Sequence, residues 1–192
     1  MKLVVGVADD ATSIDAVAYA ATLAKTFEAH VTLVTVSATA DEYINDHLDP
    51  RMGQGRSDEQ ARLVDGLAEV LESKFAVRAQ TVVHHHRSLG TGLSEIAADL
   101  DADVVVVGSG PGGSLGRFSM GSTTNAVLHR SAVPLALVPN GYARHPVPTV
   151  GRILVAFAQG QEGEAALARG AALARAAGVP LRVLTILVRH RV

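Results

Sequence analysis

The sequence predicts an α/β protein: one parallel five-stranded sheet with helices on both faces, followed by the opening of a second such unit. Strand-like segments alternate with helix-like ones, the strands are uniformly apolar, and residues 151–192 repeat residues 1–42 without a gap. Alternation and apolar strands are typical of a parallel sheet that is covered on both sides. The repeat predicts a complete domain at 1–139, a linker at 140–150 and the first strand–helix–strand of a truncated second copy at 151–192.

The repeat is visible at matching strand positions. Leu3-Val4-Val5-Gly6 aligns with Ile153-Leu154-Val155-Ala156, and Val31–Val36 aligns with Leu181–Ile186. A lone strand–helix–strand unit cannot bury the apolar faces of its strands. We therefore expect residues 153–188 to pair with another chain or with an exposed sheet edge.

Short apolar runs, each bounded by polar or turn-forming residues, predict the strands. Their apolar residues do not alternate with polar ones, which indicates burial on both faces. In the complete domain the expected strands are Leu3–Val7, Val31–Val36, Val77–His84, Val104–Val107 and Leu135–Val138. In the second copy they are Ile153–Phe157 and Leu181–Val188, around an alanine-rich helix.

Apolar residues at helical spacing predict a helix after each of the first four strands. We expect the first helix to be capped near Thr12 or Ser13. Residues 38–56 are polar and contain proline and glycine, so they predict a loop. Ser57 then begins the second helix, in a capping box with Gln60. The third helix is expected around 93–100 and the fourth at 121–130.

The composition of the 192 residues excludes several classes of function. The net charge of −2 gives no sign of a nucleic-acid or membrane partner. The absence of cysteine excludes disulfides, thiol catalysis and cysteine metal sites. Apolar runs fall far short of the roughly 20 residues that a membrane-spanning helix needs, and no signal-peptide pattern is present. We expect a cytoplasmic protein.

The segment from Gly108 to Thr124 carries the chemistry. It is rich in glycine, follows a buried strand and runs into a helix. Glycines let the backbone bring several N–H groups toward an anion, and a helix start adds unpaired donors. Ser122, Thr123 and Thr124 add hydroxyls at the same place. These features predict a phosphate site; a plain turn between strand and helix is the alternative interpretation.

This segment differs from the common phosphate-binding motifs. A Walker A loop needs a lysine, and the lysines of this chain are Lys2, Lys25 and Lys74. A dinucleotide fingerprint would follow the first strand instead of the fourth. Without a lysine or a general base, the loop is better suited to holding a nucleotide than to cleaving it. We therefore expect no enzyme, or at most slow ATP hydrolysis.

At this point the chain resembles the universal stress protein family. The family's pattern is Gly, two residues, Gly, nine residues, Gly and then Ser or Thr, and Gly108 and Gly121-Ser122 match its ends. The segment Ser131–Pro139 is also similar to its closing strand. The resemblance implies an adenine nucleotide alpha-hydrolase-like fold with sheet order 3-2-1-4-5. It also implies binding of ATP with Mg²⁺ and a role in stress response through ligand-dependent partner contacts.

The resemblance also implies the site residues, which lie at the ends of the first, second and fourth strands. They are Val7, Ala8, Asp9, Val36, Gly108, Gly110, Gly113, Arg117, Gly121, Ser122 and Thr123. Two positions depart from the family pattern. Pro111, which has no N–H, replaces the middle glycine, and Ala8 replaces an aspartate that contacts the nucleoside, with Asp9 one place later. These departures favour an alternative: a nucleotide-free dimerisation module of the same fold.

Two further groups of residues receive other interpretations. His84 and His86 point to the same side of a strand, so they could share a metal, but a solvated strand end is the favoured interpretation. Family members commonly dimerise through the fifth strand. The resemblance therefore implies a homodimer through Val133–Pro139. The uncovered apolar strands of residues 153–188 predict the other possible interface.

Overall fold

The computed structural model describes residues 1–37, 50–110 and 120–185. Contacts divide the chain into two compact units, Met1–Pro146 and Val147–Val192. Within the described residues, none of the helices combines the length and the apolar character that crossing a membrane requires.

The first unit is built on a five-stranded sheet, as predicted. All neighbouring strands are parallel, and their order is β3-β2-β1-β4-β5. The strands are β1 (Lys2–Gly6), β2 (His30–Ser37), β3 (Ala79–His85), β4 (Val104–Gly108) and β5 (Leu135–Val138). The order reverses between β1 and β4, so the carboxyl ends of these two strands flank a crevice where ligands bind in such sheets.

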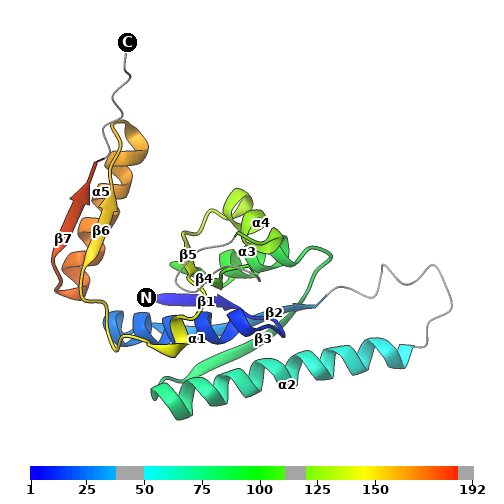
Figure 1. Cartoon of the computed structure of the whole chain (residues 1–192). Helices are drawn as coiled ribbons and strands as arrows, with labels where there is room; N and C mark the ends of the chain where they lie inside the picture. The colour runs from blue at the N-terminus through cyan, green and yellow to red at the C-terminus, as the bar shows by residue number, and fades with distance from the viewer. Residues whose placement is uncertain (38–49, 111–119, 186–192) are drawn as a thin grey trace. The chain divides into compact units, whose positions relative to one another are not determined.

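Helices cover both faces of this sheet (Figure 1). One face carries α1 (Ala11–Phe27) and α2 (Pro50–Phe75), and the other carries α3 (Leu89–Asp99) and α4 (Ser122–Arg130). The core matches a composition with only 4% aromatic residues, because valine, leucine and alanine fill it. Below α3 and α4, a buried cluster joins side chains of the central strands to those helices: Val4, Val34, Val36, Leu93, Ala97, Val105, Val107 and Val127.

The N-cap of α1 is Asp10, so the expectation of a cap at Thr12 or Ser13 was wrong. The Asp10 carboxylate accepts hydrogen bonds from the backbone N–H groups of Thr12 at 2.9 Å and Ser13 at 3.0 Å. A carboxylate is favourable there because it satisfies unpaired N–H groups at the positive end of the helix dipole.

The helix α2 begins at Pro50, so the predicted loop and the predicted capping box at Ser57 were wrong over residues 50–56. Proline is compatible with the first turn of a helix, where its missing N–H costs no hydrogen bond. The side chain of Gln60 does not cap the helix; it accepts a hydrogen bond from the Thr35 hydroxyl at 2.7 Å. Residues 38–49 of the predicted loop lie outside the described residues.

The segment after β5 packs against α1. The buried Asp15 carboxylate accepts hydrogen bonds from the N–H groups of Gly141 and Ala143, each at 2.7 Å. The Tyr142 ring contacts the Tyr19 ring edge-on, with centroids 5.3 Å apart. The first part of the predicted linker 140–150 is therefore bonded to the first unit.

The second unit contains β6 (Ile153–Ala156), α5 (Gln161–Ala177) and β7 (Leu181–Leu184), with the two strands parallel. This is the partial second repeat that the sequence predicts. Ile153 is paired with Leu181, as Leu3 is paired with Val31 in the first unit. The predicted extension of the last strand to Val188 lies beyond the described residues.

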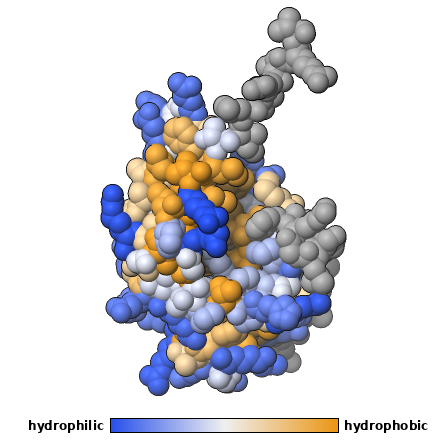
Figure 2. Space-filling view, turned by 60° about the vertical axis from the view of Figure 1, so that its left-hand side comes forward, coloured by the Kyte–Doolittle hydropathy of each residue, from blue (hydrophilic) through white to orange (hydrophobic). Residues whose placement is uncertain are grey.

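One face of the second unit's sheet is open. Leu154 is 58% exposed and Leu184 is 48% exposed, whereas their repeat counterparts Val4 and Val34 are each 1% exposed below α3 and α4. Figure 2 brings this unit forward and shows orange hydrophobic surface interrupted by blue hydrophilic residues. The second unit therefore exposes the apolar sheet face whose counterpart in the first unit is buried.

Candidate functional site

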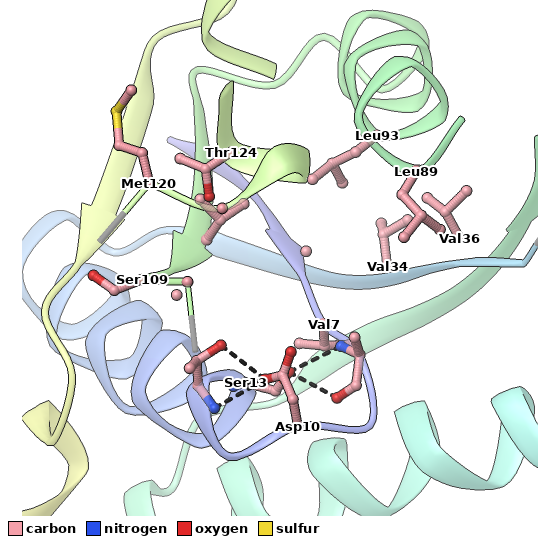
Figure 3. A pocket seen from close by; sticks show the side chains of 17 residues that line it. Val7, Asp10, Ser13, Val34, Val36, Leu89, Leu93, Ser109, Met120 and Thr124 are labelled. Carbon is pink, nitrogen blue, oxygen red and sulfur yellow. Dashed lines mark hydrogen bonds between the residues drawn. The ribbon is translucent and has the colours of Figure 1, made fainter. Parts of the chain in front are cut away.

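A cavity of about 410 Å³ lies at the carboxyl ends of β1, β2 and β4 (Figure 3), within the usual size range of small-molecule sites. Strand ends, the first turn of α1, one side of α3 and the start of α4 contribute to it. Its lining consists of Gly6, Val7, Ala8, Asp10, Thr12, Ser13, Val34, Val36, Leu89, Leu93, Val107, Gly108, Ser109, Gly110, Met120, Gly121 and Thr124.

The turn between β1 and α1 is held by internal hydrogen bonds (Figure 3). One oxygen of Asp10 accepts from the N–H and hydroxyl groups of Thr12 and from the N–H of Ser13, over 2.7 to 3.0 Å. The Ser13 hydroxyl also donates to the Ala8 carbonyl at 2.8 Å. The polar side chains of this turn are thus already engaged with one another.

Gly108 lets β4 approach α1 closely. A Cβ at this position would lie 2.5 Å from the Thr12 carbonyl oxygen and 2.8 Å from the Thr12 Cβ. No side chain larger than hydrogen fits without a backbone shift. The glycine at the start of the turn is therefore required by packing, whether or not a ligand is bound.

The start of α4 is the uncapped helix end at the cavity. Its N-cap is Gly121, and no side chain of the described residues accepts a hydrogen bond from its first turn. Unpaired N–H groups and the positive end of the helix dipole are therefore available for an anion. By contrast, the start of α1 is already neutralised by the Asp10 carboxylate.

The opposite end of the cavity is apolar, with Val34, Val36, Leu89 and Leu93 in its lining. Backbone groups of Val36 add polarity there. The Val34 carbonyl accepts from Val7 on the β1 side, and the Ser37 carbonyl accepts from His86 on the β3 side. Successive residues of a strand direct their N–H and C=O groups alternately toward the two neighbouring strands. The N–H and C=O groups of Val36 therefore point to the β1 side, as those of Val34 do. In the described sheet the pairing of β1 with β2 ends at Gly6 and Val34, so the N–H and C=O groups of Val36 lie beyond the last paired residue of β1.

The family model of the universal stress proteins matches residues 1–139. The chain belongs to the universal stress protein family. Curated universal stress proteins of Mycobacterium tuberculosis and Mycobacterium bovis are 35% identical to it over 133 residues, which are 69% of this chain and 43% of theirs. The chain thus spans less than half the length of these relatives.

Solved structures of the family share the fold. A universal stress protein from Archaeoglobus fulgidus DSM 4304 matches 97% of this chain and 67% of its own, with 14% identity and a TM-score of 0.74. A universal stress protein in complex with cAMP matches 73% of this chain and 98% of its own, with 18% identity and a TM-score of 0.55. An Archaeoglobus fulgidus universal stress protein in complex with dAMP matches 72% of this chain and 97% of its own, with 17% identity and a TM-score of 0.50.

Six of the site residues expected from the family resemblance line the cavity: Val7, Ala8, Val36, Gly108, Gly110 and Gly121. Asp9 does not line it. Asp10 does, because it caps α1 and so turns toward the cavity. Ser122 and Thr123 lie in the first turn of α4, but their side chains are not described. Gly113, Arg117 and Pro111 lie outside the described residues.

Several lining residues were missed by the sequence analysis. Leu89 and Leu93 come from α3, and Ser13 comes from α1. A signal was present for Ser13, because it lies in the first turn of the helix that follows the first strand, close to the carboxyl end of that strand. No local signal marks Leu89, since only the path of the chain brings α3 over the end of β2.

The histidine cluster differs from the expected solvated strand end. His85 is exposed, but His84 is half-buried, and its Nε2 atom is buried without a hydrogen-bond partner. The His84 and His86 rings are nearly parallel with centroids 6.3 Å apart, and His86 Nε2 lies 3.6 Å from a Glu95 carboxylate oxygen. Among the described residues, no group of three or more potential ligands is placed to hold a metal.

Proposed function

We propose that this universal stress protein binds an adenine nucleotide in the cavity, with ATP and Mg²⁺ as its ligand, and acts in stress response through ligand-dependent partner contacts. One observation carries the proposal: an uncapped helix start and an apolar slot face the same cavity. The two ends match the two chemically different ends of a nucleotide. The relatives in complex with cAMP and dAMP, both adenine nucleotides, support the same ligand class.

The phosphate end would be held by the start of α4. Gly121 leaves room beside the first turn, since a Cβ there would meet only the Cα of Gly110, at 3.4 Å. The backbone donors of α4 would then reach phosphate oxygens, which accept hydrogen bonds and carry negative charge. Mg²⁺ would be held mainly by phosphate oxygens, with Asp10 the carboxylate in the described lining.

The base end would be read by Val36. Its backbone offers one donor and one acceptor side by side, and the Watson–Crick edge of adenine offers an acceptor and a donor. Guanine presents the reverse pattern at that edge. Leu89 and Leu93 would cover the base from the side of α3. This arrangement favours adenine over guanine.

A nucleotide-free dimerisation module of the same fold is the second candidate. Ala8 favours it, since no carboxylate stands at the position where the family resemblance implies a nucleoside contact. The interface would be the edge strand β5, within Val133–Pro139, or the open face of the second unit, within residues 153–188. A cytoplasmic location is part of both proposals.

The test is calorimetric titration of the 1–192 protein with ATP and Mg²⁺, after native mass spectrometry of the freshly purified protein. We expect co-purified adenine nucleotide or micromolar binding. Gly121→Val should abolish binding, because branched carbons at this position would occupy the space of the phosphates. Gly151→Val is the matched control, since a Cβ at Gly151 meets nothing within 4 Å.

The two candidates predict different results. An empty protein that ignores ATP up to millimolar concentration would support the dimerisation module. Binding that survives Gly121→Val would place the ligand away from the start of α4. Circular dichroism of both variants verifies that the helices are retained.

A further inference from the structure

Two histidines at the end of β3 contact the start of α3 in different ways. His86 has partners on both ring nitrogens. Its Nδ1 lies 2.9 Å from both the nitrogen and the carbonyl oxygen of Ser88, the N-cap of α3, and its Nε2 lies 3.6 Å from a Glu95 carboxylate oxygen. A neutral ring accepts from the Ser88 N–H, and a charged ring donates to the Ser88 carbonyl. His86 therefore keeps a partner in both charge states.

His84 lacks such partners. Its Nε2 atom is buried and has no hydrogen bond with any described residue. The ring lies directly against the first turn of α3, since a Cβ at Gly92 would come within 3.1 Å of His84 Cδ2, the carbon bonded to Nε2. The same Cβ would lie 3.0 Å from Cγ1 of Val36 and 2.6 Å from Cβ of His86. The first turn of α3 is thus packed tightly on the ends of β2 and β3.

The charged groups around His84 do not compensate a charge on its ring. On β3, the parallel ring of His86 lies 6.3 Å away between centroids, and the Glu95 carboxylate of α3 is directed at His86. From α4, Arg130 donates to a threonine hydroxyl in the first turn of α3 at 3.2 Å, which brings a permanent positive charge to this turn. On β2, the residue paired with His84 is the apolar Val36. The positive end of the α3 dipole adds to the repulsion.

We propose that His84 is a pH sensor for the apolar end of the cavity: protonation of its ring in mildly acidic solution releases the first turn of α3 from β2 and β3. Imidazole is the side chain that ordinarily changes charge between about pH 5 and 8. A charged ring carries an N–H on both nitrogens, so Nε2 becomes a buried donor without an acceptor. Release of the turn gives Nε2 access to water. The packed turn is therefore favoured at neutral pH and lost as pH falls.

The consequence for a ligand rests on the proposed nucleotide binding. Leu89 and Leu93 of α3 line the apolar end, where they would cover the base. Acid should therefore weaken binding of the base and leave the phosphate end at α4 unchanged. Adenosine is the suitable probe for this effect, because the phosphate groups of a nucleotide themselves titrate at about pH 6.

The first experiment measures the release of α3 without any ligand. Hydrogen exchange with mass spectrometry gives protection factors for residues 88–93 of the 1–192 protein at about pH 7.5 and about pH 5.5, on either side of the usual imidazole range. We expect protection to be about tenfold lower at the acidic pH, within the cost of a buried donor that lacks an acceptor. Amides of α1 should keep their protection and serve as the internal reference.

His84→Phe keeps a planar ring without a titrating group and should abolish the change in protection. His85→Gln is the matched control, because His85 is exposed on the opposite face of β3 and should leave the change intact. Unchanged protection in the wild type would overturn the inference, and so would a change that persists in His84→Phe. Should His84→Phe fail to fold, His84→Gln removes the same titrating group with a smaller side chain.

Calorimetric titration with adenosine at the same two pH values separates this inference from the proposed function. We expect binding about tenfold weaker at the acidic pH in the wild type, by the same unsatisfied donor, and equal binding at both pH values in His84→Phe. Adenosine affinity that ignores pH in the wild type would overturn the control of the cavity by His84. If neither ATP nor adenosine binds at about pH 7.5, the proposed function fails, and hydrogen exchange still decides whether His84 senses pH.

Discussion

Ser13 and Ala8 are joined by a reciprocal hydrogen bond: the Ser13 hydroxyl donates to the Ala8 carbonyl and accepts from the Ala8 N–H, each at 2.8 Å. The side chain of Ser13 is buried, although Ala8 is exposed. The pair therefore fixes the turn after β1 onto the first turn of α1. These two hydrogen bonds thus define the cavity wall at this point.

Ser13→Ala should destabilise the first unit by about 2 kcal/mol, because it removes two hydrogen bonds worth about 1 kcal/mol each. The measurement is urea unfolding followed by circular dichroism. Ser73→Ala is the control, since its exposed hydroxyl makes only a 3.5 Å contact with the Val70 carbonyl. We expect a change below about 0.5 kcal/mol there. Equal effects of the two substitutions would show that the turn does not depend on Ser13.

The same glycine-to-alanine change should have opposite effects at two positions. Gly108→Ala places a methyl group 2.5 Å from the Thr12 carbonyl oxygen and should cost about 1–3 kcal/mol. Gly66→Ala lies in α2, where a Cβ meets nothing within 4 Å, and should stabilise by about 0.5–1 kcal/mol. Thermal unfolding midpoints give both signs. A stable Gly108→Ala protein would contradict the close approach of β4 to α1.

The strands were predictable because burial on both faces leaves an uninterrupted apolar run. The prediction Val104–Val107 matches β4 to one residue. Helix starts were less predictable. Asp10, Thr12 and Ser13 can all cap a helix, and only the three-dimensional turn decides that Asp10 accepts while the other two donate. Proline and glycines in 50–56 favour a loop locally, yet the structure continues α2 through them.

The location of the site was predictable, and its full lining was not. Gly108 and Gly121 are marked by the glycine-rich turn between a strand and a helix, and both line the cavity. Leu93 looks like any core leucine in the sequence, because its role depends on where α3 crosses β2. Thr124 also lines the cavity, and it closes the run Ser122-Thr123-Thr124 that the glycine-rich segment leads into.

Stability should fall at high pH through Tyr19. Burial raises the pKa of Tyr19 above its ordinary value, with a smaller contribution from the nearby Tyr142. Below pH of about 10 the phenol is protonated in both states. Above that, the unfolded chain ionises first, so the contribution to stability is lost as pH rises through the raised folded pKa.

Tyr19→Phe tests this effect because it keeps the ring contact with Tyr142 and removes the titrating group. Thermal midpoints measured from pH 8 to pH 11 should fall less steeply for the variant than for the wild type. The two curves should run parallel between pH 8 and 9, where neither state ionises. Parallel curves up to pH 11 would exclude Tyr19 as the source of the alkaline loss.

Self-association should depend on the open face of the second unit. In the first unit β4, α3 and α4 cover the counterparts of Leu154 and Leu184, whereas both leucines are exposed here. These leucines are about half exposed, so burying the remainder of each side chain against a second copy would recover about 1–1.5 kcal/mol, roughly half the value for a fully exposed leucine. We expect light scattering to give a dimer for the wild type and a monomer for the double variant Leu154→Ser, Leu184→Ser.

Leu128→Ser is the matched control, because Leu128 is 50% exposed on α4, outside both proposed interfaces. It should leave the dimer intact. A dimer that persists in the double variant would transfer the interface to Val133–Pro139, whose strand β5 is an edge of the five-stranded sheet and has unpaired backbone groups to offer. A monomeric wild type would contradict both interfaces, and apolar exposure on the second unit would then need another kind of partner.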